Sequence, residues 1–177
     1  MTILTETINK LLRDTVNVIL DTPNFTIESR QNAPRPIGSY ADVDFISDAS
    51  VGWERTYLED RDELNVDSYS EGLREVMMSI GFYRDNSIDN GRKVHIGLTR
   101  NSILSMFRTA NIGLIRRTEV REISESLENG WEERAQMDVV LSVIGNDADI
   151  IESINSLDII GEFQARGLIY NFNIEVE

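Results

Sequence analysis

The first twenty residues carry apolar side chains at the spacing of an amphipathic helix. Residues three and four apart share one face of a helix, so this pattern predicts a helix over residues 3–20 with one buried face. The helix is expected to end before Pro23, because proline interrupts helical hydrogen bonding. The residues that set the spacing are Ile8, Leu11, Leu12, Thr15 and Ile19.

Alternation of apolar and polar residues predicts strands in the rest of the chain. Residues 134–144 alternate most cleanly, as a strand with one buried face requires. Similar alternation predicts a strand over residues 73–83 and two C-terminal strands within residues 157–176. Two further runs predict a hairpin that turns at Ser47-Asp48-Ala49-Ser50, with an acidic loop from Glu59 to Tyr69 after it and another turn at Asn146–Asp149.

Residues 86–108 predict a second helix, although Gly91, Gly97 and Asn101 weaken its pattern. Asn86 or Ser87 is the expected N-cap. Strands in runs with few helices favour an α+β fold, in which two helices pack on one face of a mostly antiparallel sheet. The length of 177 residues predicts a single domain.

Residues 30–40 contain two of the three prolines of the chain, in the run Arg30-Gln31-Asn32-Ala33-Pro34-Arg35-Pro36-Ile37-Gly38-Ser39-Tyr40. Each proline ring fixes φ and favours an extended conformation in the residue before it. This Pro-rich segment is therefore expected to be stiff and non-helical, which suits a preorganised contact.

The charge of the chain is strongly acidic and unevenly distributed. There are 31 acidic and 17 basic residues, a formal net charge of −14. Residues 38–71 are mainly acidic, whereas residues 72–121 are mainly basic, and all but Lys10 and Lys93 of the basic residues are arginine. Segments of opposite sign favour contacts between copies, and arginine is enriched at interfaces. A solvated acidic surface that keeps a monomer in solution explains the same composition.

The residues give no good catalytic, cofactor or metal constellation, so we expect no enzyme and no cofactor. His95 is the only histidine and cysteine is absent, which excludes thiolate sites, disulfides and two-histidine metal sites. The stretch from Asp67 to Gly72 resembles a calcium loop but has Tyr69 at the third position and Met78 at the twelfth. No apolar run approaches the ~18 residues of a membrane helix, and the N-terminus lacks a signal peptide, so we expect a soluble protein made in a cytoplasm.

Nucleic-acid binding is a weaker hypothesis, because the net charge is strongly negative and no known binding module is present. Pairing of the basic stretch with the acidic loop of a neighbouring copy accounts for both kinds of segment. The basic stretch consists of Arg92, Lys93, Arg100, Arg108, Arg116, Arg117 and Arg121.

Three segments resemble phage neck terminator (tail terminator-like) proteins. The Pro-rich segment resembles the family's "QNAPRP-x-G-x-Y" stretch, with Ser39 where the family often has another proline. Residues 78–85 (Met-Ser-Ile-Gly-Phe-Tyr-Arg-Asp) resemble a strand that ends in F-Y-x-D, and residues 131–138 (Trp-Glu-Glu-Arg-Ala-Gln-Met-Asp) resemble an aromatic-x-E-R-A-Q strand start. The resemblance covers roughly residues 5–145.

The resemblance implies a structural virion protein of a tailed phage, found at the neck or the top of the tail after assembly in the host cytoplasm. It implies a ring, most simply a hexamer, that caps the tail tube and joins it to the head-side connector. The expected partners are other copies, the tail tube protein and the connector, with DNA passing through unbound and no membrane contact. A head-completion adaptor or a tube subunit is the structural alternative, and a soluble enzyme or ligand-binding module is the alternative from another class.

Two sets of residues are candidates for function. The interface candidates are the motif residues Arg30, Gln31, Asn32, Pro34, Arg35, Pro36, Tyr40, Glu133, Arg134 and Gln136. Arg35 is expected to pair with a carboxylate, while Arg134 could pair within its own subunit or across an interface. The candidates for a channel lining are Asp60, Asp62 and Glu63, since negative walls keep a polyanion mobile. Placement on an outer rim explains the same acidic stretch.

Overall fold

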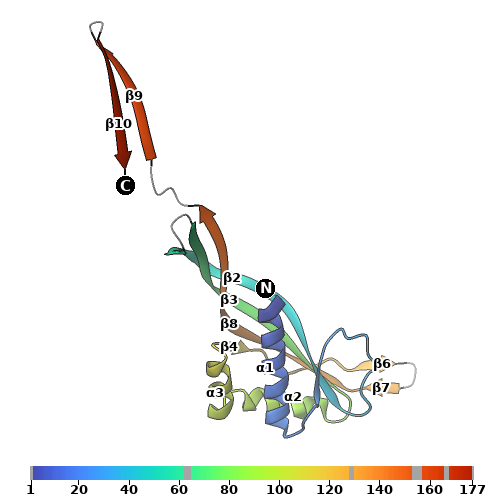
Figure 1. The fold of residues 1–177 in the computed structure, drawn as a ribbon. Helices are drawn as coiled ribbons and strands as arrows, with labels where there is room; N and C mark the ends of the chain where they lie inside the picture. The colour runs from blue at the N-terminus through green and yellow to red at the C-terminus, as the bar shows by residue number, and fades with distance from the viewer. Residues whose placement is uncertain (1, 62–64, 128–129, 153–156, 166–167, 177) are drawn as a thin grey trace. The chain divides into compact units, whose positions relative to one another are not determined.

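The computed structural model describes residues 2–61, 65–127, 130–152, 157–165 and 168–176 (Figure 1). The chain divides into two compact units: Met1–Trp53 with Leu73–Gly145, and Glu54–Gly72 with Asn146–Glu177. That the two units fold cooperatively as one domain, as the chain length predicts, stays a prediction.

The fold is α+β with a mostly antiparallel sheet, as predicted, and the described residues form three helices where the sequence predicts two. The helices are α1 (Thr2–Leu20), α2 (Ser87–Gly97) and α3 (Asn101–Thr109). The main sheet has the order β1-β2-β3-β8-β4, and β5 also pairs with β8. Its strands are β1 (Thr26–Glu28), β2 (Tyr40–Asp60), β3 (Asn65–Tyr83), β4 (Gly113–Arg117), β5 (Arg121–Glu122) and β8 (Arg134–Glu152).

Two small sheets complete the described strands. One is the pair β6 (Glu125–Leu127) and β7 (Gly130–Glu132), and the other is the antiparallel pair β9 (Leu157–Ala165) and β10 (Leu168–Val176). The two C-terminal strands predicted within residues 157–176 are thereby confirmed, and they pair with each other.

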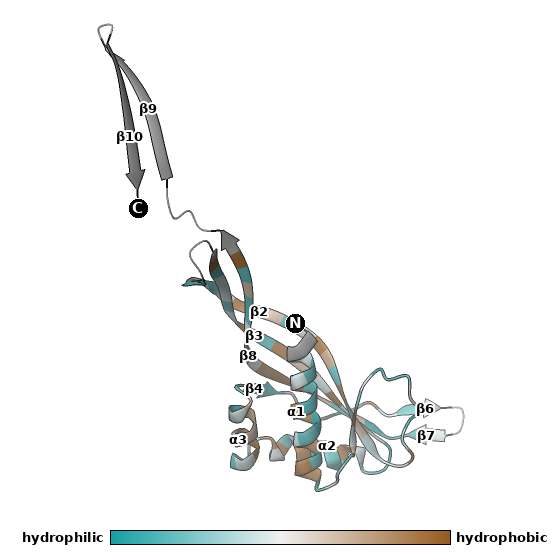
Figure 2. Cartoon of the chain, in the orientation of Figure 1, coloured by the Kyte–Doolittle hydropathy of each residue, from teal (hydrophilic) through white to brown (hydrophobic). Residues whose placement is uncertain are grey.

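The core lies between the helices and one face of the main sheet. Alternate residues of β3 and β8 are buried there, as strand periodicity requires, and they meet the apolar face of α1. Figure 2 shows hydrophobic stretches along β2, β3 and β8. The core residues with 0% exposure include Leu12, Val16, Val43, Met78, Ile80, Phe82, Val94, Leu98, Met137, Val139 and Leu141. Burial of each such large apolar side chain contributes about 1.5–3 kcal/mol.

The strands are longer than the sequence predicts. The polar run Ser47–Ser50 lies inside β2 instead of forming a turn, and most of the predicted acidic loop from Glu59 to Tyr69 belongs to β2 and β3. Likewise, Asn146–Asp149 lies within β8. Polar residues suggest turns locally, but pairing with neighbouring strands satisfies the backbone groups of these runs and keeps them extended.

The predicted helix over residues 86–108 is divided into α2 and α3. Leu98 is fully buried after the last turn of α2, and Arg100 is extended, with φ −66° and ψ 141°. The Thr99 hydroxyl donates a hydrogen bond to the Ile96 carbonyl (3.0 Å), which satisfies an acceptor at the end of α2. The weakening glycine Gly97 is the last residue of α2, where an added Cβ would lie 2.5 Å from Ile19 Cγ2.

Candidate functional site

The Pro-rich segment joins β1 to β2 and is held by the chain from both ends. At its start, Arg30 has the left-handed φ of 59° and its guanidinium donates to Asp44 Oδ2 (2.8 Å). At its end, Arg84 Nη1 donates to the carbonyls of Pro36 (2.6 Å) and Gly38 (3.1 Å). The prolines make the segment stiff, and these hydrogen bonds hold it in one position against β2 and β3.

Two stacked tyrosines join the end of the segment to strand β3. The rings of Tyr40 on β2 and Tyr83 on β3 are 4.6 Å apart and inclined by 10°. The guanidinium of Arg84 lies 5.7 Å from the Tyr40 ring centre, and that of Arg134 lies 5.6 Å from the Tyr83 ring centre. The two tyrosines and two arginines therefore form one cation–π assembly.

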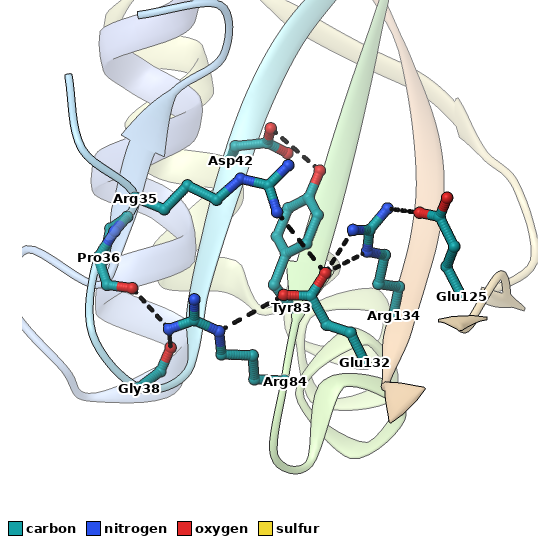
Figure 3. Close-up of polar contacts among 9 residues, drawn as sticks. All are labelled: Arg35, Pro36, Gly38, Asp42, Tyr83, Arg84, Glu125, Glu132 and Arg134. Atoms are coloured by element: carbon teal, nitrogen blue, oxygen red, sulfur yellow. Dashed lines mark hydrogen bonds and ion pairs between the residues drawn. The ribbon is translucent and has the colours of Figure 1, made fainter. Parts of the chain in front are cut away.

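Glu132 is the centre of the charge cluster (Figure 3). Its side chain is only 8% exposed and accepts a hydrogen bond from Arg134 Nε at 2.6 Å. Two weaker ion pairs reach it, from Arg84 Nε (3.5 Å) and from Arg35 Nη1 (3.7 Å). Arg134 also contacts Glu125. Three guanidinium groups thus share one buried carboxylate, and one further carboxylate lies at the edge.

The pKa values follow from these contacts. Burial alone would raise the pKa of Glu132, but the hydrogen bond and charge of Arg134 outweigh it, so the pKa lies below the ordinary value of 4.5. Burial and the nearby Asp42 carboxylate raise the pKa of Tyr83 well above its ordinary value. Burial also raises the pKa of Asp42, which accepts hydrogen bonds from Ser29 (2.9 Å) and Tyr83 (3.2 Å).

A pocket of about 480 Å³ opens beside the Pro-rich segment. It brings together six of the ten predicted interface residues with the tyrosine pair and Asp42. Arg35 is the most exposed guanidinium of the cluster (59%) and has the longest contact with Glu132. The predicted residues that line the pocket are Arg30, Gln31, Pro34, Arg35, Pro36 and Tyr40.

The remaining predicted residues lie elsewhere or have other roles. Glu133 Oε1 accepts hydrogen bonds from the Ile88 backbone N–H (3.5 Å) and the Ser87 hydroxyl (3.1 Å) at the start of α2, whereas the predicted cap Asn86 makes no side-chain cap bond. Gln136 donates to the Ser79 hydroxyl (2.7 Å). Asn32 is exposed and does not line the pocket.

Arg35 contacts the carboxylate of Glu132 in the same chain (3.7 Å), and its pairing with a carboxylate at an interface stays a prediction. Arg134 likewise pairs within its own chain, which is one of the two alternatives that the sequence left open. Of the channel candidates, Asp60 is exposed at the end of β2, and Asp62 and Glu63 lie outside the described residues.

Sequence reasoning missed Glu132, Arg84 and Tyr83 as site residues, although all three stand in the motifs. The sequence signal that marks these residues is their place in the three family motifs. Segments that lie far apart in the chain meet here in one cluster. Among the described residues, no group of three or more histidine or acidic side chains could hold a metal ion, and none of the described helices is long and apolar enough to cross a membrane.

The chain is thus an α+β protein in which the charge cluster around Glu132 holds the Pro-rich segment at the surface. A family model described as phage neck terminator protein matches residues 4–165, and the chain belongs to that family. It is thus a structural protein of the phage neck. No curated protein matches the chain.

Proposed function

We propose that this protein forms a ring at the head–tail junction, most simply a hexamer, which caps the tail tube and joins it to the head-side connector. The observation that supports this most directly is the convergence of the three motifs on the Pro-rich segment. The Pro-rich segment carries an exposed arginine, Arg35 (59%), and an exposed apolar residue, Ile37 (102%), and Trp131 (73%) is exposed one residue before Glu132. Arginine and tryptophan are the residue types that dominate binding energy at protein interfaces.

The three residues belong to two neighbouring segments. Ile37 follows Pro36, whose carbonyl accepts a hydrogen bond from Arg84, and Trp131 precedes Glu132, which pairs with both Arg84 and Arg35. We define Arg35 and Ile37, which both lie on the Pro-rich segment, as the docking surface. Because its backbone is already ordered, little conformational entropy is lost when a partner binds.

The test combines position and mass. Imaging of intact virions should find a closed ring of this chain between the tail tube and the connector. A single copy, or an open helical stack, contradicts the ring. A position inside the head-completion complex or along the tube favours the adaptor or the tube subunit.

Substitution of Arg35 by Ala tests the docking surface. We expect the yield of joined particles to fall at least about tenfold, as truncation of an interface arginine costs more than about 1.4 kcal/mol at a binding hot spot. Lys10→Ala is the control, because Lys10 is an exposed cation on α1 that lies outside both the Pro-rich segment and the basic stretch. Normal joining and titre for Arg35→Ala indicate that the Pro-rich segment only connects strands.

The acidic stretch is proposed to line the channel. Asp60, Asp62 and Glu63 would repel the phosphates of DNA and keep it mobile, whereas exposed cations would hold it through counterion release. Reversal of these three charges to lysine should slow DNA ejection from particles that assemble normally. Unchanged ejection kinetics place the stretch on an outer rim.

A further inference from the structure

The pocket beside the Pro-rich segment holds a carboxylate with no cation next to it. Asp42 stands between the core residues Ala41 and Val43 on β2, so it lies on the sheet face opposite the core, where it lines the pocket. Its carboxylate accepts hydrogen bonds from the neutral hydroxyls of Ser29 (2.9 Å) and Tyr83 (3.2 Å; Figure 3). Within the described part of the chain, no lysine or arginine makes an ion pair with it.

The two arginines that line the pocket have carboxylates of their own. Arg30 donates to Asp44 Oδ2 (2.8 Å) and Arg35 contacts Glu132 (3.7 Å), and neither of these acids lines the pocket. Their charges are therefore balanced outside the pocket, whereas that of Asp42 is not. Because burial disfavours the charged form of a carboxylate, a cation that enters the pocket is stabilised beside Asp42.

The pocket has the size and the walls for one long basic side chain. Its volume of about 480 Å³ lies in the range of ligand pockets, and Pro34, Pro36 and Tyr40 give it apolar walls. Basic side chains bury their aliphatic part along such surface, and a planar guanidinium offers two N–H donors to one carboxylate. An arginine side chain therefore fits both the walls and Asp42.

An arginine at the other edge of the main sheet has the complementary properties. β1, beside the pocket, and β4 stand at the two ends of the strand order, and Arg116 of β4 lies opposite Val140 of β8. Arg117 lies opposite the core residue Val139 and bonds to His95 of α2, so it is on the helix side. Arg116 is therefore on the same sheet face as the pocket, and it is exposed, with no ion pair to any described residue.

The edge of β4 suits a side-chain contact better than the addition of another strand. The register of β4 on β8 shifts between Leu114 and Arg116. Such a bulge bends an edge strand and redirects its side chains, which interrupts the row of backbone groups that a further strand would pair with. A neighbour at this edge therefore meets the arginine side chain.

We propose that the pocket of one copy receives the Arg116 side chain of a second copy, whose guanidinium pairs with Asp42. The proposal rests on the proposed assembly into a ring and names one of its contacts. The pocket and Arg116 lie at opposite edges of one sheet, so the contact joins two different surfaces. Such a contact repeats from copy to copy and can close a ring, in which every Asp42 is paired.

A small arginine probe tests the chemistry of the pocket in the purified protein. N-acetyl-arginine amide is compared with N-acetyl-citrulline amide, which has nearly the same shape but no charge, and binding is followed by the amide NMR signals of Ser29 and Gln31. The arginine probe should bind at least about tenfold more tightly, because its hydrogen bonds to a carboxylate are charge-assisted. Asp42→Asn should remove this difference. Asp14→Asn, at an exposed aspartate of α1, is the matched control and should keep it.

Three results of the probe experiment overturn the proposal. They are no binding of the arginine probe, equal binding of the two probes, and tighter binding of N-acetyl-glutamate amide. The last result makes the pocket an anion site of Arg30 and Arg35. The comparison of the three probes on the wild type decides the question even if Asp42→Asn does not fold.

A double-mutant cycle tests the second copy as the source of the arginine. Self-association is measured by sedimentation at low salt, and the same cycle is measured on the yield of joined particles. Asp42→Asn and Arg116→Gln should each weaken assembly at least about tenfold, and the double variant should be no weaker than either single variant. Lys10→Gln, at an exposed cation of α1, is the control and should assemble as the wild type does. Additive losses, or normal assembly of Arg116→Gln, overturn the proposal.

The two proposals fail in different ways. If the virion contains a ring of this chain and the effects of Asp42→Asn and Arg116→Gln are independent, the contact is wrong and the proposed function stands. If the pocket binds the arginine probe under the same outcome, another protein supplies the arginine. If the virion contains no ring of this chain, the proposed function itself is wrong.

Discussion

Substitution of Glu132 by Gln is the sharpest test of the charge cluster. Gln keeps the size and shape of the side chain but removes the charge that three guanidinium groups share. Breaking a buried ion pair by removal of one partner costs about 3–5 kcal/mol. Arg35 and Arg84 keep contact with water (59% and 33% exposed), so we expect the lower end, about 3 kcal/mol.

Urea and thermal unfolding measure this loss. For a chain of this size, about 3 kcal/mol corresponds to a decrease in Tm of roughly 6–12 °C. Glu125→Gln is the matched control, because Glu125 contacts the same Arg134 but is 55% exposed. An exposed pair contributes about 0–1 kcal/mol, so the control should unfold nearly as the wild type does.

The same substitution changes the acid limb of the stability curve. The folded pKa of Glu132 lies below its ordinary value, so its stabilisation is complete above about pH 4.5 and is lost as the pH falls through the folded pKa. Glu132→Gln should therefore lose less stability than the wild type below pH 4.5. The reasoning is wrong if Glu132→Gln unfolds within 1 kcal/mol of the wild type at pH 7, or if the two acid limbs are parallel.

Two further predictions concern the helices. Gly97→Ala should destabilise by about 1–2 kcal/mol despite its better helix propensity, since the new Cβ would lie 2.5 Å from Ile19 Cγ2; an unchanged or raised Tm contradicts this packing. Burial and the Arg117 charge lower the pKa of His95, whose Nε2 accepts a hydrogen bond from Arg117 Nε (3.2 Å). Because the folded state binds the proton less well, stability should fall as the pH decreases from about 6.5. His95→Gln should remove this decrease, and equal pH profiles of Tm between pH 7.5 and 5.5 would refute it.

The spacing of apolar residues was sufficient to predict those helices and strands whose apolar face packs into the core. The helical spacing of Ile8, Leu12 and Ile19 predicts α1, and these residues are buried as expected. Alternation over residues 134–144 predicts β8 and its buried face. The sequence also predicted that the Pro-rich segment is stiff, because its prolines restrict the backbone without any tertiary contact.

Only the tertiary structure decided the lengths of the strands and the members of the charge cluster. Ser47–Ser50 has the composition of a turn, yet it stays extended inside β2, since pairing with a neighbouring strand outweighs local preference. Glu132 is one of 31 acidic residues, and nothing in its local sequence marks it as buried. Its role depends on Arg35, Arg84 and Arg134, which come from separate segments, and a carboxylate becomes the centre of a site only when the fold removes it from water beside those cations.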